Sequence, residues 1–446
     1  MSTSTPQIKS SIMSATAACW ALLVSMCIVM VSNGLQGTLL GLRATFEGFD
    51  TATTGFVMAG YFAGFAGGSL IATRLIQRVG HVRVFAALAS LASIAPLIHV
   101  MFIDPYVWFG GRLLTGFSYA GIYVVCESWL NDRATNETRG KLLSVYMVLM
   151  IGGMGAGPLF MNFAHPTAVD LFILASVLVS IALVPILLAA SPAPSVETPS
   201  KLGLLELYKL SPLGVSGTFV VGMSNGGLVG MAAVYSNSLG FSIAEISLLI
   251  PLIFLGSVTF QIPIGMLSDH FDRRLVLIFV TFAASVVPFV TISHGDYSIF
   301  PLMVTFFVFG GLSFPMYSLC LSHANDRLET TQMLAASSTL VLVAGVGAIL
   351  GPPIASYCMT YIGNDGYLWY FVVIHLAVGM FALYRVTRRS SIPLEDQENM
   401  AFGPQMAAVA PAFTTDTYLE IADGYETTEE DNGDDNDSNK SEISGP

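Results

Sequence analysis

The chain has 446 residues, of which 54% are hydrophobic and 11% are charged, and this balance excludes a water-soluble globular protein. The formal net charge of −12 comes from one end, because residues 390–446 hold 14 acidic residues and a single Lys. The rest of the chain is nearly neutral. The composition therefore predicts a protein embedded in a lipid bilayer, and we expect no nucleic-acid partner.

Twelve apolar stretches are long enough to cross a hydrocarbon core of about 30 Å, and stretches of this length cross as helices. They lie near residues 15–40, 52–73, 83–103, 106–130, 141–165, 167–190, 213–236, 245–267, 275–293, 299–322, 333–357 and 367–386. Basic residues collect in the termini and in alternate loops, and of the 18 Lys and Arg only Arg43 and Arg112 lie elsewhere. Because basic loops prefer the cytoplasmic side, we expect a multi-pass protein of the cell membrane with both termini in the cytoplasm.

The two halves of the chain repeat each other at a separation of 192 to 194 residues. The repeated pieces are the polar and small-residue interruptions of the apolar stretches. The matching segments are Ser32-Asn33-Gly34 and Ser224-Asn225-Gly226, Asn131-Asp132-Arg133 and Asn325-Asp326-Arg327, Gly116 and Gly310, and 153–158 and 347–352. A repeat of this kind predicts an all-α membrane protein of two pseudo-symmetric six-helix bundles.

The repeat and the composition together divide the chain into five segments. These are a cytoplasmic N-terminus (1–14), an N-terminal bundle (15–190), an inter-bundle linker (191–210), a C-terminal bundle (211–388) and an acidic cytoplasmic tail (389–446). The tail is too polar to bury a core, which favours a solvated, disordered segment. A docking segment for a soluble partner is the alternative.

Short motifs in the expected cytoplasmic loops tie the chain to a known family. Residues 265–274, Gly-Met-Leu-Ser-Asp-His-Phe-Asp-Arg-Arg, closely resemble the loop signature of the major facilitator superfamily. The first-half counterpart, residues 73–83, keeps Arg78 and Gly80 but has Gln77 where an acid is usual. The resemblance implies the twelve-helix fold of that family.

Further motifs within the apolar stretches support the same resemblance. Residues 112–116 resemble the family's fourth-helix motif, and residues 153–158 resemble a fifth-helix motif often associated with exporters. Residues 123–132 resemble the YcaD-like branch of the family. The resemblance covers residues 15–388 and excludes the tail.

The loop signature implies a gate on the cytoplasmic side. Asp269, at the end of the eighth stretch, is expected near the start of the fifth, where Arg139 and a helix N-terminus favour an anion. Gln77 takes the place of the matching acid in the first half, so a symmetric second lock is not expected. The other residues expected in this layer are Arg78, Gly80, Asp132, Asp272, Arg273, Arg274 and Asp326.

The repeated glycine and proline residues predict helix packing. Glycine allows the backbones of two helices to approach closely in lipid, and proline bends a helix. We therefore expect close contact and a bend in each half, at Gly153, Gly157 and Pro158 and at Gly347, Gly351 and Pro352.

Two charged residues lie inside the fourth apolar stretch, where charge is costly and is usually functional. Arg112 and Glu127 are about 22 Å apart along a helix, too far for a direct pair, but both could face one cavity. Arg112 is a candidate for substrate contact or proton coupling, with structural hydrogen bonding as the alternative. Glu127 is a candidate proton carrier, or else a partner of the cytoplasmic loops.

A cavity between two bundles needs polar groups from both. The symmetric pair Asn33 and Asn225 fits this requirement best. Each of the remaining candidates also suits helix packing: Gln36, Tyr61, Tyr119, Tyr123, Asn162, Tyr235, Gln261, Tyr317 and His375.

The sequence as a whole predicts a monomeric secondary transporter that moves a small molecule by alternating access, driven by protons, with export favoured. We expect no cofactor, no metal site and no enzyme activity, because no nucleotide-binding loop and no metal or nucleophile spacing is found. A membrane sensor with the acidic tail as its output is the alternative. An anion, a zwitterion and a neutral amphiphile fit the polar candidates equally well.

Overall fold

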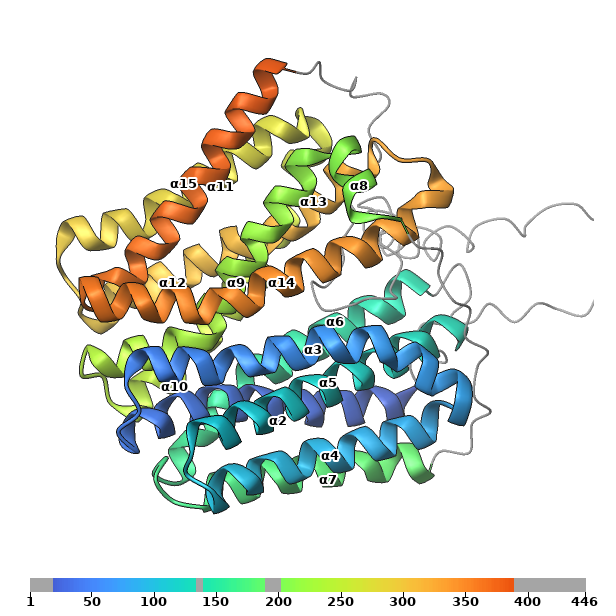
Figure 1. Ribbon diagram of the computed structural model, residues 1–446, viewed down its shortest axis with the longest axis vertical. Coiled ribbons are helices and arrows are strands. Elements are labelled where there is room, and N and C mark those ends of the chain that lie inside the picture. The colour runs from blue at the N-terminus through green and yellow to red at the C-terminus, as the bar shows by residue number, and fades with distance from the viewer. Residues whose placement is uncertain (1–18, 134–138, 189–201, 389–446) are drawn as a thin grey trace, which may run out of the picture.

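The structure is a computed structural model that describes residues 19–133, 139–188 and 202–388. The described chain is built of helices joined by short turns (Figure 1). The expectations for the N-terminus (1–14), for the acidic tail (389–446) and for residues 191–201 of the linker lie outside the described residues.

The first bundle holds the first six spans. They are α2 (Trp20–Phe46), α3 (Thr51–Val79), α4 (His81–Met101), α5 (Pro105–Arg133), α6 (Arg139–Ala156) continued by the 3₁₀ helix η1 (Gly157–Phe163), and α7 (Asp170–Leu188). Helix α5 packs against α3 and α4 and carries both charged residues of the fourth span.

The second bundle repeats this arrangement after the short helix α8 (Leu204–Leu210). Its spans are α9 (Pro212–Ser238), α10 (Ile243–His270), α11 (Arg273–His294), α12 (Ile299–Ser313) continued by α13 (Pro315–Asn325), α14 (Thr330–Ile362) and α15 (Asp365–Arg388). Within the described residues, 11 spans are long and apolar enough to cross a membrane. The 29-residue helix α5, which carries Arg112 and Glu127, packs against α3 and α4 as the twelfth. The predicted fold of two six-helix bundles is confirmed.

Small residues bring equivalent helices together in the two bundles. A β carbon at Gly64 on α3 would overlap the Leu113 carbonyl group of α5, and one at Gly116 on α5 would overlap the Tyr61 carbonyl group. In the second bundle, a β carbon at Gly256 on α10 would overlap the Phe307 carbonyl group of α12. Close backbone contact of this kind is how helices associate in lipid, where the hydrophobic effect gives no drive.

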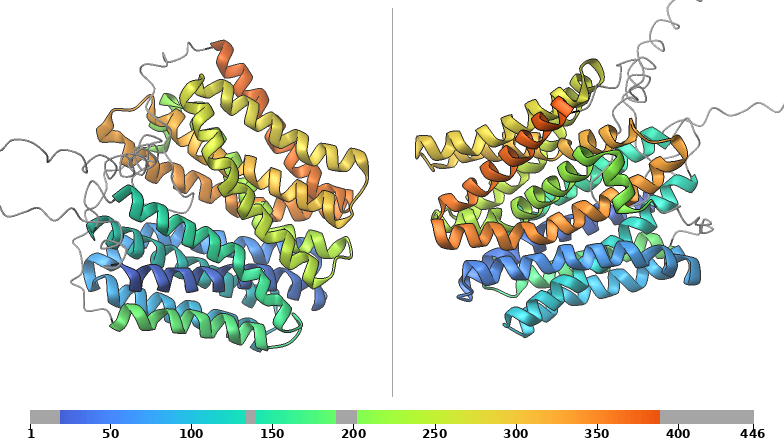
Figure 2. Two further views of the ribbon diagram at one scale, coloured as in Figure 1. Left: turned by 180° about the vertical axis from the view of Figure 1, so that it is seen from behind. Right: turned by 45° about the horizontal axis from the view of Figure 1, so that its top comes forward.

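The bundles meet at one end of the molecule. We call the end where α2 begins and α15 ends the terminal face, and the other end the opposite face. At the opposite face, the Asn162 amide on η1 donates to the Ser247 hydroxyl at 2.9 Å, and Asn237 on α9 donates to Thr45 at 3.3 Å. Towards the terminal face the two bundles diverge (Figures 1 and 2). The structure is therefore closed at the opposite face.

Candidate functional site

A cavity of about 310 Å³ lies between the two bundles. Four spans of the first bundle (α2, α3, α5 and α6) and four of the second (α9, α10, α13 and α14) line it. The contacts that join the bundles at the opposite face lie beyond it, and its lining continues along α6 and α10 towards the terminal face through Ser144 and Gln261. The cavity thus has the position of a central substrate site.

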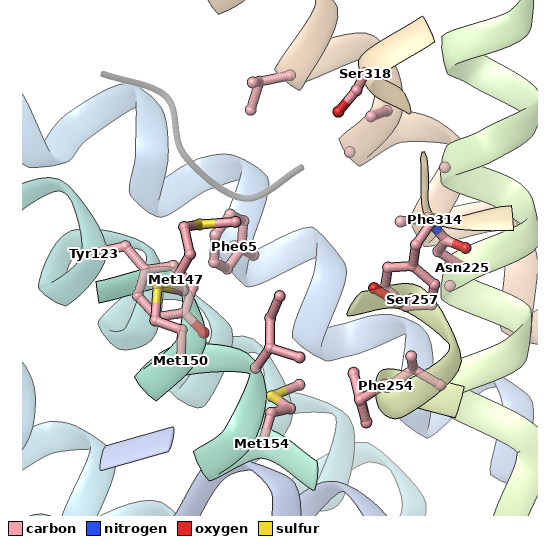
Figure 3. A pocket seen from close by; sticks show the side chains of 18 of the residues that line it. Phe65, Tyr123, Met147, Met150, Met154, Asn225, Phe254, Ser257, Phe314 and Ser318 are labelled. Carbon is pink, nitrogen blue, oxygen red and sulfur yellow. The ribbon is translucent and has the colours of Figure 1, made fainter. Parts of the chain in front are cut away.

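The wall formed by the first bundle is dominated by sulfur and aromatic side chains (Figure 3). Met147, Met150 and Met154 lie along one side of α6, and Met30 joins them from α2. The Tyr123 hydroxyl on α5 donates to the Met30 sulfur at 3.1 Å, so the polar end of this tyrosine is held by the wall itself. This surface is apolar and made of flexible, polarisable groups.

The amide side chains of the described lining belong to the wall formed by the second bundle. Figure 3 shows Asn225, Ser257 and Ser318 across the cavity from the methionines, together with Phe254 and Phe314. The cavity lining also includes Gln261, which donates its amide N–H to the Ser318 hydroxyl at 3.2 Å. Among the described lining residues there is no Asp, Glu, Lys, Arg or His.

The two asparagines of the repeat take different positions. Asn225 lines the cavity, and its side-chain oxygen accepts a hydrogen bond from Ser313 at 2.9 Å. Asn33 lies one layer behind the first wall, where its amide donates to Tyr61 at 2.9 Å and to Tyr123 at 3.4 Å. The repeat therefore identified one lining residue and one residue that supports the lining. Gln36 is buried on α2 outside the described lining.

Arg112 lies inside the first bundle, away from the cavity. Its side chain is 3% exposed, and its guanidinium carbon lies 4.6 Å from the centre of the Tyr61 ring. Its Nε and Nη1 atoms have no hydrogen-bond partner in the described part of the chain. Tyr61 accepts from Asn33, which in turn contacts Tyr123. Arg112 is thus connected to the cavity wall through three side chains.

Glu127 is also fully enclosed, with 0% exposure. The Tyr146 hydroxyl on α6 donates to its carboxylate at 3.4 Å. Glu127 lies four residues after Tyr123 on α5, which places it one helical turn towards the terminal face. Neither Glu127 nor Arg112 is among the described lining residues of the cavity, so the structure does not bring the two side chains together there.

The gate residues of the second half form an ionic cluster at the terminal face. Arg273 pairs with Asp326 at 2.5 Å, and both side chains are 2% exposed. Arg273 also donates to Ser268 at 3.0 Å and lies 3.9 Å from Asp269. The Asp269 carboxylate at the end of α10 thus lies beside Arg273 at the start of α11. The side chain of Arg139, its expected partner, lies outside the described residues.

Asp272 caps the start of α11. Its carboxylate accepts a hydrogen bond from the Arg274 backbone N–H at 3.0 Å and forms an ion pair with the Arg274 side chain at 2.8 Å. Partial burial acts to raise the pKa of Asp272, but these hydrogen bonds outweigh it and hold that pKa below its ordinary value.

The first-half gate residues are arranged differently. Arg78 and Asp132 are exposed, and Gly80 forms the turn between α3 and α4 with φ of 86°, a conformation that favours glycine. At the position equivalent to Arg273, His81 lies 2.7 Å from the Ser128 hydroxyl. The first half has no counterpart of the Arg273–Asp326 pair among its described residues.

The predicted packing residues lie at helix contacts. A β carbon at Gly153 or Gly157 would overlap backbone atoms of α2, and one at Gly347 or Gly351 would overlap backbone atoms of α9. In the first half the α-helix gives way to the 3₁₀ helix at Gly157, with Pro158 inside that segment. In the second half α14 remains one helix from Thr330 to Ile362, with Pro352 within it.

Sequence reasoning missed the methionine wall. Met147, Met150 and Met154 follow one another at spacings of three and four residues, which places them on one face of a helix. This spacing is visible in the sequence, but methionine on a helix face is more often a packing residue. Ser257 and Ser318 gave no signal, because serine is common in membrane helices.

Comparison with known proteins agrees with this architecture. A family model described as Major Facilitator Superfamily matches residues 22–213 and again residues 214–419. The chain belongs to this superfamily. It is 26% identical over 379 residues to a protein of Escherichia fergusonii named “Uncharacterized MFS-type transporter YcaD”, a match that covers 84% of this chain and 97% of that protein. The resemblance to the YcaD-like branch is confirmed.

Solved structures show the same fold at low sequence identity. The nucleoside transporter NupG, in a mutant form, gives a TM-score of 0.73 at 13% identity, covering 83% of this chain and all of the other. A D-xylose-proton symporter gives a TM-score of 0.65 at 14% identity, covering 83% of this chain and 97% of the other. The chain is thus a multi-pass membrane protein with the fold of a major facilitator transporter.

Proposed function

We propose that this transporter moves a small molecule by alternating access, with the central cavity as its substrate site. The cavity between the two bundles, closed at the opposite face, carries this proposal. A second conformation, closed at the terminal face and open at the opposite face, would release or take up the same molecule. Such a cycle requires that the two bundles rock about the cavity as largely rigid bodies.

Proton coupling is assigned to Glu127. An acidic residue enclosed in a membrane bundle is costly and rare, and such residues usually have a function. Glu127 lies one turn from Tyr123, and Tyr123 lines the cavity. Protonation of Glu127 would therefore be felt at the substrate site through α5. A structural neighbour is described as a proton symporter, which agrees with such a role.

Arg112 is assigned to positioning the first wall. Its guanidinium group stacks on Tyr61, which holds Asn33 against Tyr123. A shift of the arginine would move Tyr61, Asn33 and Tyr123 in turn and change the shape of the cavity that Tyr123 lines. Arg112 would thus act on substrate binding without touching the substrate.

The terminal face is assigned to the cytoplasm, on the basis of the basic loops, and the described conformation is then open to the inside of the cell. Closure would bring Asp269 to the start of α6, where Arg139 and the helix N-terminus attract an anion. The resemblance of residues 153–158 to an exporter motif favours export. We further propose that the protein acts as a monomer in the cell membrane.

Reconstituted vesicles test the proposal. Purified protein is placed in liposomes with an imposed pH gradient, which a pH-sensitive dye in the lumen reports. Compounds from a library are then added, and a substrate is expected to collapse the gradient in vesicles that contain the protein but not in empty ones. If compounds bind the protein but none moves a proton or itself across the bilayer, a sensor of the same fold is indicated and the transport cycle is refuted.

A further inference from the structure

The two walls of the central cavity differ in chemistry, and this difference bears on the substrate. The methionines of the described lining all belong to the first bundle and its amide groups, Asn225 and Gln261, to the second, whereas both walls carry aromatic and hydroxyl groups (Figure 3). A molecule that fills the cavity therefore meets thioether groups on one side and amide groups on the other.

The described lining contains no charged side chain. Arg112 and Glu127 are enclosed in the first bundle and are not among the described lining residues, and the Arg112 guanidinium group lies against the ring of Tyr61. In an alternating-access cycle the substrate is shut off from water between the two open states. A charged substrate would then be enclosed with no opposite charge in contact with it, which costs far more than enclosing a neutral molecule.

We propose that the substrate is an uncharged amphipathic molecule, with its apolar body against the methionines of α6 and its polar group directed to Ser257 and Gln261 on α10. This inference rests on the proposed function and names the substrate class of the same cavity. Methionine has three rotatable bonds and a polarisable sulfur, so it adapts to apolar bodies of different outline. The site accordingly accepts several molecules of this class.

The position of the polar groups adds an orientation. Ser257 and Gln261 are four residues apart on α10, so both lie on the same face of that helix. One of the two N–H groups of the Gln261 amide is donated to Ser318, which leaves the carbonyl oxygen as an acceptor and the second N–H as a donor. A substrate N–H or O–H group on this side can therefore donate a hydrogen bond to the Gln261 carbonyl oxygen, and α10 binds the polar end of the substrate.

A binding experiment on the purified full-length protein tests the charge rule. The probe is N-phenylnaphthylamine, an uncharged aromatic amine whose emission rises in apolar surroundings. Its anionic counterpart is anilinonaphthalenesulfonate, and its cationic counterpart carries a trimethylammonium group on the same rings. We expect saturable binding of the neutral probe, and binding of both charged probes weaker by about tenfold or more. Equal or tighter binding of either charged probe would overturn the proposal.

Matched variants locate the probe. The double change Met147→Ala and Met150→Ala should weaken binding of the neutral probe by about tenfold, because each removes apolar contact area. The control is Met101→Ala with Met380→Ala, two methionines that are 71% and 54% exposed, and it should leave binding unchanged. The substitution of Leu at 147 and 150 preserves volume and should keep binding, which separates a lost contact from a misfolded protein. Equal losses in the alanine double variant and the control would place the probe outside the cavity.

A third comparison tests the orientation. Phenylnaphthalene lacks the N–H group of the amine probe and should compete several-fold less well for the wild-type protein. The double change Ser257→Ala and Gln261→Leu should abolish that difference, and a difference that persists would refute the assigned orientation.

These assays measure binding alone. If a charged or strongly polar compound collapses the pH gradient in vesicles while the neutral probe does not bind, the substrate class is wrong and the transport proposal stands.

Discussion

The two bundles share a fold but hold their charges in different places. In the first bundle, Arg112 and Glu127 are enclosed within α5. Residues 194 positions later are Phe306 and Leu321, so the second bundle is apolar at the same sites. At the terminal face the pattern reverses, because the enclosed Arg273–Asp326 pair belongs to the second bundle.

This comparison suggests a division of roles between two copies of one ancestral unit. A charge in the middle of a bundle can respond to a proton or a substrate, whereas an ionic cluster at the end of a bundle can bias which face is open. Under the proposed function, the first bundle would respond to a proton or a substrate, and the second would stabilise one of the two open states.

The largest expected effect is on coupling in the first bundle. Glu127→Gln keeps the shape of the side chain and removes its ability to change charge, so we expect proton-linked transport in vesicles to fall to the rate of empty liposomes. Binding of the neutral probe should remain, because Glu127 does not line the cavity. Glu206→Gln, a change in an exposed acid of α8, is the control and should transport normally. Proton-linked transport at the wild-type rate in Glu127→Gln would show that Glu127 is not the proton carrier.

The next effect concerns stability at the terminal face. Arg273→Ala removes one side of the enclosed Arg273–Asp326 ion pair and should lower the free energy of unfolding by about 3–5 kcal/mol. Arg78→Ala, at the exposed first-half position, should change it by less than about 0.5 kcal/mol. Thermal unfolding of both variants in the same detergent measures the difference. Similar losses in the two variants would contradict the asymmetry between the halves.

How far the sequence could predict these features follows from their physical causes. Span positions depend on apolar length, which is local, and most of the observed helices begin and end within a few residues of the expected stretches. The largest differences are at the first span, which is displaced towards Phe46, at α3, which continues to Val79, and at α14, which continues to Ile362. The two-bundle arrangement followed from the repeat. The positions of the spans and their division into two bundles can therefore be predicted from the sequence.

The candidate site was predicted less well, because helix rotation about its own axis is set by packing. Asn33 and Asn225 are equivalent in sequence, yet only Asn225 lines the cavity within the described lining. The rotation of α2 turns Asn33 onto Tyr61 instead. Similarly, the sequence made Arg112 a candidate for substrate contact, and its guanidinium group stacks on an aromatic ring within its own bundle. Charge in a span indicates importance but not the direction of the side chain.

A smaller effect is expected from Arg112. Arg112→Ala removes the stacking contact with Tyr61, and we expect binding of the neutral probe to weaken by about tenfold, or about 1.4 kcal/mol. The effect should be indirect, since Asn33 and Tyr123 lose their support. Tyr61→Phe removes only the hydroxyl that accepts from Asn33 and should give a partial loss. If Arg112→Ala binds the probe as the wild type does, its positioning role is wrong.

The smallest expected effect concerns the start of α11, where Asp272 occupies the position that Gly80 holds in the first half. Asp272→Ala removes a helix cap and should lower the free energy of unfolding by about 1 kcal/mol at neutral pH.

Because the pKa of Asp272 is lowered in the folded protein, its ionic contribution is fully present above the ordinary aspartate pKa of about 3.9 and is lost as the pH falls through the lowered value. Asp272→Asn keeps a capping oxygen and has no charge to lose. We therefore expect Asp272→Asn to be less stable than the wild type at neutral pH and equal to it in strong acid, as measured by thermal unfolding. A difference that is independent of pH would show that the cap, and not its charge, distinguishes the two halves at this turn.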